Sequence, residues 1–221
     1  MQSSDEPTYI YLHGFASSPK SAKARYLGDR FAALGLSLKI PDLNQGDFSN
    51  LTLTRQIKQV AAEFPPPPSS ITLIGSSFGG LTAAWLAQMY PQVQRLILLA
   101  PAFQFLQHWL PKLGEEQLQR WQVEVYLPVY HYGEMKKMPL NYRFIEDILE
   151  YAEQQLQRAV PTLILHGVDD EVIPIQASRD FAAERPWVKL LEIDSDHALG
   201  NVQAEIWEAI CQFCQLPSNP G

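Results

Sequence analysis

The sequence contains a G-x-S-x-G motif at the junction between an expected strand and an expected helix. Apolar residues 71–74 precede residues 75–79 (GSSFG), and helix-forming residues 81–89 follow. A strand that turns directly into a helix forces the central residue into a strained backbone conformation, so the residues two positions away must lack side chains. The five-residue pattern alone arises by chance too often to be specific, and the strand pattern before it and the helix pattern after it make it more specific. The motif therefore predicts a strand–turn–helix unit with the Ser77 hydroxyl above the end of the strand.

Apolar and helix-forming segments alternate along the rest of the chain. The expected strands are apolar and rich in β-branched residues, and they lie at 9–12, 36–40, 71–74, 96–99, 162–165 and 189–193. The expected helices lie at 21–34, 53–64, 81–89, 175–183 and 202–214. This alternation is typical of a parallel sheet covered on both faces. We expect an α/β protein with a doubly wound, mainly parallel sheet of about six or seven strands.

One long segment, residues 103–158, interrupts the alternation and exceeds the length of an ordinary crossover. It is rich in aromatic residues: Phe103, Phe105, Trp109, Trp121, Tyr126, Tyr130, Tyr132, Tyr142, Phe144 and Tyr151. These rings fit two interpretations, a satellite core of the segment's own or a cap whose underside binds an apolar substrate group. We expect a single domain over residues 1–221 with a small cap or lid inserted at about 103–158.

Composition excludes several kinds of partner. The chain has 221 residues, 46% of them hydrophobic, and a formal charge of -7, so it can bury a full core but lacks the basic surface that nucleic acids or anionic membranes require. The first seven residues carry acid where a signal peptide carries base, and no apolar run reaches the length of a membrane span. We expect a cytoplasmic protein with no stable membrane association.

The only two cysteines, Cys211 and Cys214, lie one turn apart on an expected helix. A metal or redox role would need more ligands or a position at a helix N-terminus. We therefore expect both thiols to pack in the core, and we expect no metal and no cofactor.

A serine nucleophile needs a base that takes its proton and an acid that orients the base. In this kind of sheet both come from loops after later strands, in the order serine, acid, histidine. Asp170 follows the strand expected at 162–165 and is the preferred acid, with Asp169 and Glu171 as competitors. The expected base is His197, which follows the last strand.

The four other histidines have more ordinary interpretations. His13 and His166 each precede a glycine at the end of a strand, where we expect packing or hydrogen bonding within a tight turn. His108 and His131 lie in the 103–158 segment and could reach the site only if that segment folds over it. We expect surface or cap packing for both.

The oxyanion of an acyl-transfer intermediate needs preorganised donors, and losing one donor costs about 3 kcal/mol of transition-state stabilisation. The backbone N–H of Phe78 directly follows the serine, and the backbone N–H of Phe15 lies in the loop after the first strand. These two amides are the expected oxyanion hole. The two phenyl rings could line the acyl pocket or pack in the core.

Four motifs together resemble one known family. They are residues 11–24 (YLHGFASSPKSAKA), 75–80 (GSSFGG), 170–172 (DEV) and 197–199 (HAL). The chain resembles a serine α/β-hydrolase, closest to the small bacterial YqiA/YcfP-type esterases. The resemblance implies the α/β-hydrolase fold, cleavage of carboxylic esters or thioesters without a cofactor, and the roles given above to Ser77, Asp170 and His197. The middle segment departs from the family pattern, so substrate preference is not carried over.

These observations predict a serine hydrolase that cleaves a small-molecule ester or thioester with an apolar acyl group through an acyl-enzyme intermediate. The same fold hosts thioesterases, C–C hydrolases and lyases, so these remain alternatives. A non-catalytic binding protein is a further alternative, which loss of a triad residue would favour.

The assignment of His197 as the base predicts a pH dependence. Only neutral imidazole accepts the proton of Ser77, so kcat/KM should rise with pH, with a midpoint of roughly 6 to 7.5, the range in which histidines usually titrate. Initial rates measured from pH 5 to 9 test this, and a flat profile across that interval would contradict the assignment.

Overall fold

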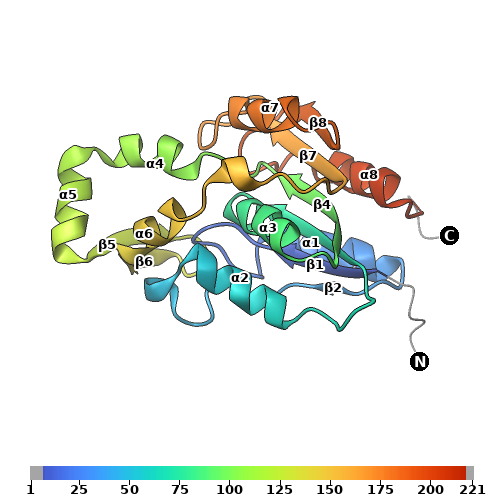
Figure 1. Cartoon of the computed structure of the whole chain (residues 1–221), viewed down its shortest axis with the longest axis horizontal. Helices are drawn as coiled ribbons and strands as arrows, with labels where there is room; N and C mark the ends of the chain where they lie inside the picture. The colour runs from blue at the N-terminus through green and yellow to red at the C-terminus, as the bar shows by residue number, and fades with distance from the viewer. Residues whose placement is uncertain (1–6, 218–221) are drawn as a thin grey trace.

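The computed structural model describes residues 7–217, and a six-stranded parallel sheet forms its centre (Figure 1). The strands lie side by side in the order β2-β1-β3-β4-β7-β8. Their bounds are β1 Thr8–Leu12, β2 Leu38–Lys39, β3 Ile71–Ser76, β4 Val93–Leu99, β7 Thr162–Gly167 and β8 Val188–Ile193. The mainly parallel α/β architecture predicted from the alternating pattern is confirmed.

The central strands are buried on both faces, which explains their continuous apolar sequences. Successive residues of β4 contribute to opposite cores: Leu96 and Leu98 pack on one face of the sheet, and Ile97 and Leu99 pack on the other. Helices α1 (Ala22–Ala33) and α8 (Gln203–Cys214) cover the second face. Helices α2 (Leu53–Ala62), α3 (Phe78–Met89) and α7 (Gln176–Ala183) cover the first.

Side-chain caps fix the start of two of these helices. The Ser21 hydroxyl accepts a hydrogen bond from the N–H of Ala24 at the start of α1. The Thr52 hydroxyl accepts one from the N–H of Arg55 at the start of α2. Such caps satisfy N–H groups that have no partner within the helix.

Several elements differ from the sequence prediction at their ends. Strand β4 begins at Val93, three residues before its expected start at 96. The strand expected at 36–40 is only Leu38–Lys39, because β2 lies at the edge of the sheet with β1 as its only neighbour, and Pro41 cannot extend the ladder. The helix expected from Leu81 begins at Phe78, because Ser77 itself occupies the N-cap position. The turn between β3 and α3 is therefore a single residue.

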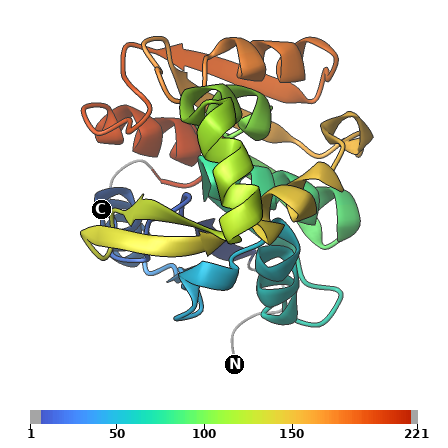
Figure 2. The same cartoon turned by 90° about the vertical axis from the view of Figure 1, so that its left-hand side faces the viewer.

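The 103–158 segment connects the adjacent strands β4 and β7 and has its own secondary structure. It contains α4 (Phe105–Leu113), α5 (Glu115–Glu124), the antiparallel pair β5 (Tyr126–His131) and β6 (Lys136–Asn141), α6 (Arg143–Leu149) and the short 3-10 helix η2 (Glu153–Gln155). These elements extend from one end of the sheet, and Figure 2 views them from that end (Figures 1 and 2).

The aromatic residues of this segment do not form a separate core. Trp121 and Phe144 are buried in the same cluster as the side chains beneath α2 and α3. The Phe144 ring stacks on Phe15 at 5.1 Å between centroids, and Phe105 and Trp109 contact the same ring. The interpretation of these rings as a separate satellite core is therefore wrong, because the buried rings of the segment belong to the main core.

Within residues 7–217, no helix has both the length and the apolar character needed to cross a bilayer.

The glycines of the motif allow α3 to approach two strands closely. A Cβ atom on Gly75 would overlap the carbonyl oxygen of Gly79, and a Cβ atom on Gly79 would overlap the carbonyl oxygen of Leu12 in β1. Backbone atoms cannot move aside as a flexible side chain can. Glycine at both positions is therefore a requirement of backbone packing.

We predict that Gly79→Ala lowers the free energy of unfolding by about 2–3 kcal/mol, because the new methyl group meets the backbone of β1. Chemical denaturation measures the change. Gly28→Ala in α1 is the matched control, since its Cβ would meet only the Ile40 side chain at 3.6 Å and alanine favours helix. Equal effects of the two substitutions would contradict the prediction.

Candidate active site

Ser77 occupies a strained turn at the end of β3. Its backbone has φ 53° and ψ -120°, values that side-chain-bearing residues rarely adopt. The turn is held by a hydrogen bond from the Ser77 N–H to the Leu99 carbonyl (2.9 Å), while the Ser77 carbonyl accepts from Ala102 (3.0 Å). Ser77 is half-buried although its neighbours are buried. The local fold thus leaves the hydroxyl accessible.

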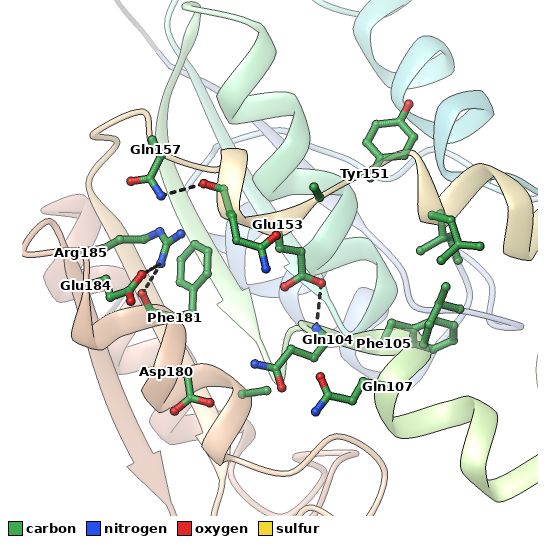
Figure 3. A pocket seen from close by; sticks show the side chains of 16 residues that line it. Gln104, Phe105, Gln107, Tyr151, Glu153, Gln157, Asp180, Phe181, Glu184 and Arg185 are labelled. Atoms are coloured by element: carbon green, nitrogen blue, oxygen red, sulfur yellow. Dashed lines mark hydrogen bonds and ion pairs between the residues drawn. The ribbon is translucent and has the colours of Figure 1, made fainter.

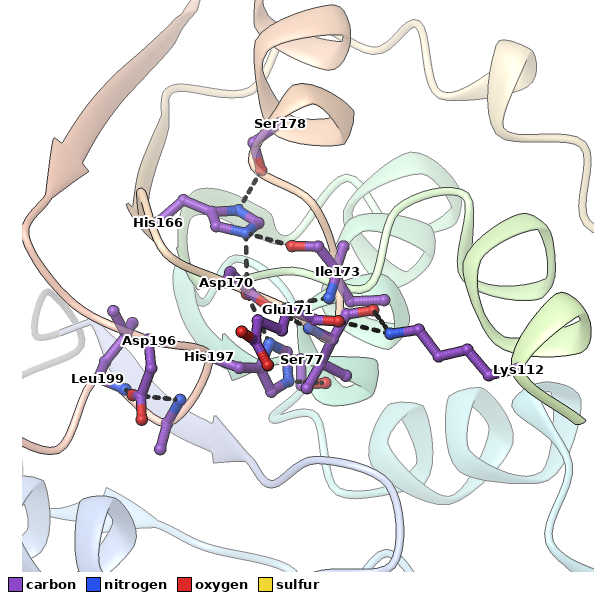
Figure 4. A network of polar contacts seen from close by, with 12 residues as sticks. Ser77, Lys112, His166, Asp170, Glu171, Ile173, Ser178, Asp196, His197 and Leu199 are labelled. Atoms are coloured by element: carbon purple, nitrogen blue, oxygen red, sulfur yellow. Dashed lines mark hydrogen bonds and ion pairs between the residues drawn. The ribbon is translucent and has the colours of Figure 1, made fainter.

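Three side chains from three different loops form a hydrogen-bonded line (Figure 4). The Nε2 atom of His197 lies 3.0 Å from the Ser77 Oγ atom, and its Nδ1 atom lies 2.6 Å from the Asp170 Oδ2 atom. Ser77 follows β3, Asp170 follows β7 and His197 follows β8. The structure therefore brings together the three residues that the sequence singled out.

The loops that carry Asp170 and His197 are joined to each other through the backbone. The Asp169 N–H donates to the Ser195 carbonyl at 3.1 Å. The competing acids Asp169 and Glu171 are exposed, whereas the side chain of Asp170 is fully buried. Of the three candidates, Asp170 is the one that contacts His197.

Four hydrogen bonds satisfy the buried Asp170 carboxylate. Its Oδ1 atom accepts from the N–H groups of Val172 and Ile173, both at 2.8 Å. Its Oδ2 atom accepts from His197 and from His166 Nε2 at 3.0 Å. Burial alone would raise the pKa of this carboxyl, but the hydrogen bonds from His166 and His197 hold it well below its ordinary range. Asp170 is therefore ionised near neutral pH.

His166 has a role that the sequence analysis missed. The expected packing and hydrogen bonding of His166 within its turn are confirmed, since it is buried at the end of β7; what was not predicted is that its Nε2 atom faces the acid Asp170 as well as the Ile173 carbonyl. Two acceptors require a proton on Nε2, and the Nδ1 atom lies 2.7 Å from the Ser178 hydroxyl on the other side of the ring. The only sequence signal was its position four residues before the acid.

A partly buried cation lies near the same loops. The ammonium group of Lys23 in α1 interacts electrostatically with Asp170 and Asp196. Burial lowers the pKa of Lys23 to about 8, against the pull of those two carboxylates. Asp196 is held by the backbone, because its Oδ1 atom accepts from the N–H groups of Ala198 and Leu199.

The loop after β1 lies directly beside Ser77. A Cβ atom on Gly14 would be 3.3 Å from the Ser77 Cβ atom, so the Gly14–Phe15 backbone borders the hydroxyl. His13 braces this loop, since its Nε2 atom accepts from the Leu43 N–H and its Nδ1 atom donates to the Gly14 carbonyl, both at 3.0 Å. Burial lowers the pKa of His13, which favours this neutral form.

Helix α4 of the 103–158 segment contacts both ends of the triad. The Phe105 ring lies 5.3 Å from the ring of Phe78, the residue after Ser77. At the other end, the Lys112 ammonium donates to the carbonyls of Glu171 and Val172 in the acid loop (Figure 4). His108 lies on the same helix, and burial lowers its pKa.

His131 is buried and its ring packs edge-on against Phe48 at 4.8 Å. Cys211 and Cys214 are free and buried, and burial raises the pKa of Cys214 to about 11. Among the described residues, no group of three or more His, Cys, Asp or Glu side chains could hold a metal ion.

A cavity of about 460 Å³ lies between the start of α4, the η2 segment and α7 (Figure 3). None of the three triad residues lines it. Its wall includes Glu153, whose Oε1 atom accepts from the Gln104 N–H at 2.8 Å. Burial raises the pKa of Glu153 from 4.5 to about 7, against this hydrogen bond and the charge of Arg185.

Comparison with known proteins identifies the family. Residues 8–215 match the model of an uncharacterised protein family, UPF0227. The chain belongs to this family. The predicted resemblance to YqiA/YcfP-type esterases within the serine α/β-hydrolase superfamily is confirmed.

Two solved structures illustrate the similarity in fold. Est1E from Butyrivibrio proteoclasticus, solved with bound ferulic acid, has a TM-score of 0.79 and 20% identity over 97% of this chain and 90% of that one. The mouse alpha/beta hydrolase domain-containing protein 10 has a TM-score of 0.76 and 23% identity over 96% and 90%. The UPF0227 chain thus has the α/β-hydrolase fold.

The raised pKa of Glu153 predicts a pH-dependent stability. The folded state retains a proton that the unfolded state loses above pH 4.5, so stability falls as pH rises from 4.5 towards 7. Glu153→Gln keeps an acceptor for the Gln104 N–H and does not titrate, so its stability should not fall over this pH range for this reason. We predict that the variant is more stable than the wild type by about 1–3 kcal/mol at pH 8 and nearly equal at pH 4.5.

Thermal unfolding at the two pH values measures this difference. Glu116→Gln on the exposed surface of α5 is the control, and it should change stability little at either pH. A Glu153→Gln variant that is no more stable than the wild type at pH 8 would contradict the prediction.

Proposed function

We propose that this UPF0227 protein is a serine hydrolase that cleaves carboxylic esters through a Ser-His-Asp triad. The observation that carries the proposal is the continuous line of hydrogen bonds from the Ser77 Oγ atom through His197 to Asp170. The serine is accessible at a strained turn, and the acid is buried and ionised. These are the features that a serine nucleophile requires.

The reaction follows from these contacts in two steps. The Nε2 atom of His197 takes the Ser77 proton as the Oγ atom attacks the ester carbonyl. The protonated His197 then donates that proton to the departing alcohol, which leaves an acyl group on Ser77. Water attacks the acyl-enzyme by the same route and regenerates the serine. Each proton and each reacting group in these two steps comes from the protein, the ester or water.

Asp170 keeps His197 in the reactive tautomer. Because Asp170 accepts at His197 Nδ1, the proton of neutral His197 stays on Nδ1 and leaves Nε2 free to act as base. His166 and the two loop N–H groups hold the carboxylate in place, so it does not need to reorganise when His197 becomes charged.

The backbone N–H groups of Phe15 and Phe78 are the proposed oxyanion hole. Phe78 is the first residue of α3, where the N–H has no partner within the helix, and Phe15 lies in the loop that borders Ser77. Among the described residues, neither N–H donates a hydrogen bond to a protein acceptor. Both donors are thus available to a developing negative charge.

The proposed substrate is a small ester with an apolar acyl group, and the 103–158 segment is the proposed cap. The rings of Phe15, Phe78, Phe105 and Trp109 cluster beside Ser77, which suits an apolar group. Est1E, a protein of the same fold, binds an aromatic carboxylic acid. A thioester would follow the same steps, and a comparison of acyl-CoA with acyl esters of equal chain length separates the two substrates.

We predict that a fluorophosphonate probe labels the wild-type protein covalently and that Ser77→Ala abolishes labelling. Asp170→Asn should slow labelling by about 10³–10⁴-fold, because His197 loses its preferred tautomer. Mass spectrometry of the intact protein measures the adduct. Ser37→Ala, at an exposed position far from the motif, is the control and should label at the wild-type rate. Absence of labelling in the wild type would contradict the proposed function.

A further inference from the structure

The cavity beside α7 has the dimensions and wall of a small-molecule site. Its volume of about 460 Å³ falls within the range of about 300–1,000 Å³ that such sites occupy. It lies between the start of α4, the η2 segment and helix α7 (Figure 3). Apolar side chains form part of the wall, among them Phe105, Ile148 and Phe181. No step of the proposed reaction uses this cavity.

The carboxyl group of Glu153 is the partly buried acid of this wall. The Glu153 carboxyl lies among the lining side chains and uses one oxygen to accept from the Gln104 N–H. Among the described residues, no side-chain nitrogen of a Lys, Arg or His lies within 4.0 Å of a Glu153 carboxylate oxygen. Its raised pKa has burial as its first cause, so the carboxylate form lacks sufficient compensation in the protein alone.

The positive charge that acts on this carboxyl, that of Arg185, is already engaged with other groups. The buried guanidinium of Arg185 donates to the carbonyls of Leu156 and Phe181, both at 2.9 Å. It also lies over the Phe181 ring at 4.1 Å and contacts Glu184 at 3.9 Å. Arg185 is thus fixed by the protein and is not directed at an incoming anion.

The remaining charged groups of the wall are acidic. Asp180 and Glu184 of the α7 region lie at the exposed side of the cavity, and the polar groups from the other elements are neutral: Gln104, Gln107, Tyr151, Gln154 and Gln157. The wall therefore carries three carboxyl groups against one guanidinium. An anionic ligand would be repelled, and a cation would gain a partner.

We propose that this cavity binds a small organic cation, an amine with an apolar portion, and that the Glu153 carboxylate is its counter-ion. The ammonium group would lie against Glu153, and its N–H groups match the lining amide oxygens. The apolar portion would lie against Phe105 and Phe181. Because Phe105 also contacts Phe78 beside the nucleophile, the ligand would share one side chain with the wall of the active site.

The charge of the counter-ion sets the pH dependence of binding. A cation prefers the ionised carboxyl, so binding lowers the pKa of Glu153 and releases a proton. Affinity should therefore increase as pH rises through 7. The other charged or titratable groups that face the cavity are Asp180, Glu184, Arg185 and Tyr151, and burial raises the pKa of Tyr151 above its ordinary value, so its phenol stays neutral over this interval.

Titration of the full-length protein with n-hexylammonium chloride tests the proposal, with binding followed by NMR or calorimetry at pH 6 and pH 8. We expect saturable binding that is at least fivefold tighter at pH 8. Hexanoate and 1-hexanol, which have the same chain length without the positive charge, should bind at least tenfold more weakly. Equal binding of hexanoate and hexylammonium would overturn the proposal, as would affinity that is unchanged or weaker at pH 8.

Two variants locate the binding site. Glu153→Gln should weaken hexylammonium binding at pH 8 at least tenfold and abolish its pH dependence, whereas Glu116→Gln on α5 should bind as the wild type does. Asp180→Asn, at an exposed position of the same wall, should weaken binding two- to threefold. Binding that survives Glu153→Gln unchanged would overturn the proposal. Fluorophosphonate labelling of Ser77 is independent of these titrations.

Discussion

The backbone contact between helix α3 and strands β1 and β3 is the constraint on which the site depends. Gly75 and Gly79 remove two side chains, so α3 begins one residue after the strand and packs against the Leu12 carbonyl. This close approach, together with the hydrogen bond from the Ser77 N–H to the Leu99 carbonyl, holds Ser77 at φ 53°. The contacts around the first turn of α3 thus maintain the strained backbone of Ser77, and this backbone keeps the hydroxyl accessible above a buried core.

The buried charge of the acid, Asp170, is stabilised differently, by hydrogen bonds to both of its carboxylate oxygens. Asp170 accepts two backbone and two imidazole hydrogen bonds, and bonds of this type to a charged group contribute about 1.5–3 kcal/mol each. Glu153 is the contrasting case in the same chain, a carboxyl with one backbone donor and no ion pair within the described residues. Hydrogen bonding therefore lowers one carboxyl pKa where burial raises the other.

Much of the fold was predictable because its signals are local. Continuous apolar runs identified β3, β4 and β7, and the polar residues Ser21 and Thr52 mark the starts of α1 and α2. The second strand was predicted too long because its pairing depends on an edge position that sequence does not show. The cavity at Glu153 was not predicted, because its wall combines side chains from three elements that are distant in sequence.

The sequence by itself determined the strand–turn–helix unit at Ser77 and the order of serine, acid and histidine, since each follows from residue types at short range. Tertiary structure decided which of three adjacent acids meets His197, because only the packing of the β7 and β8 loops buries Asp170 and exposes its neighbours. It also decided that His166 supports that acid and that the 103–158 segment shares the main core. Contacts between residues distant in sequence fixed these features.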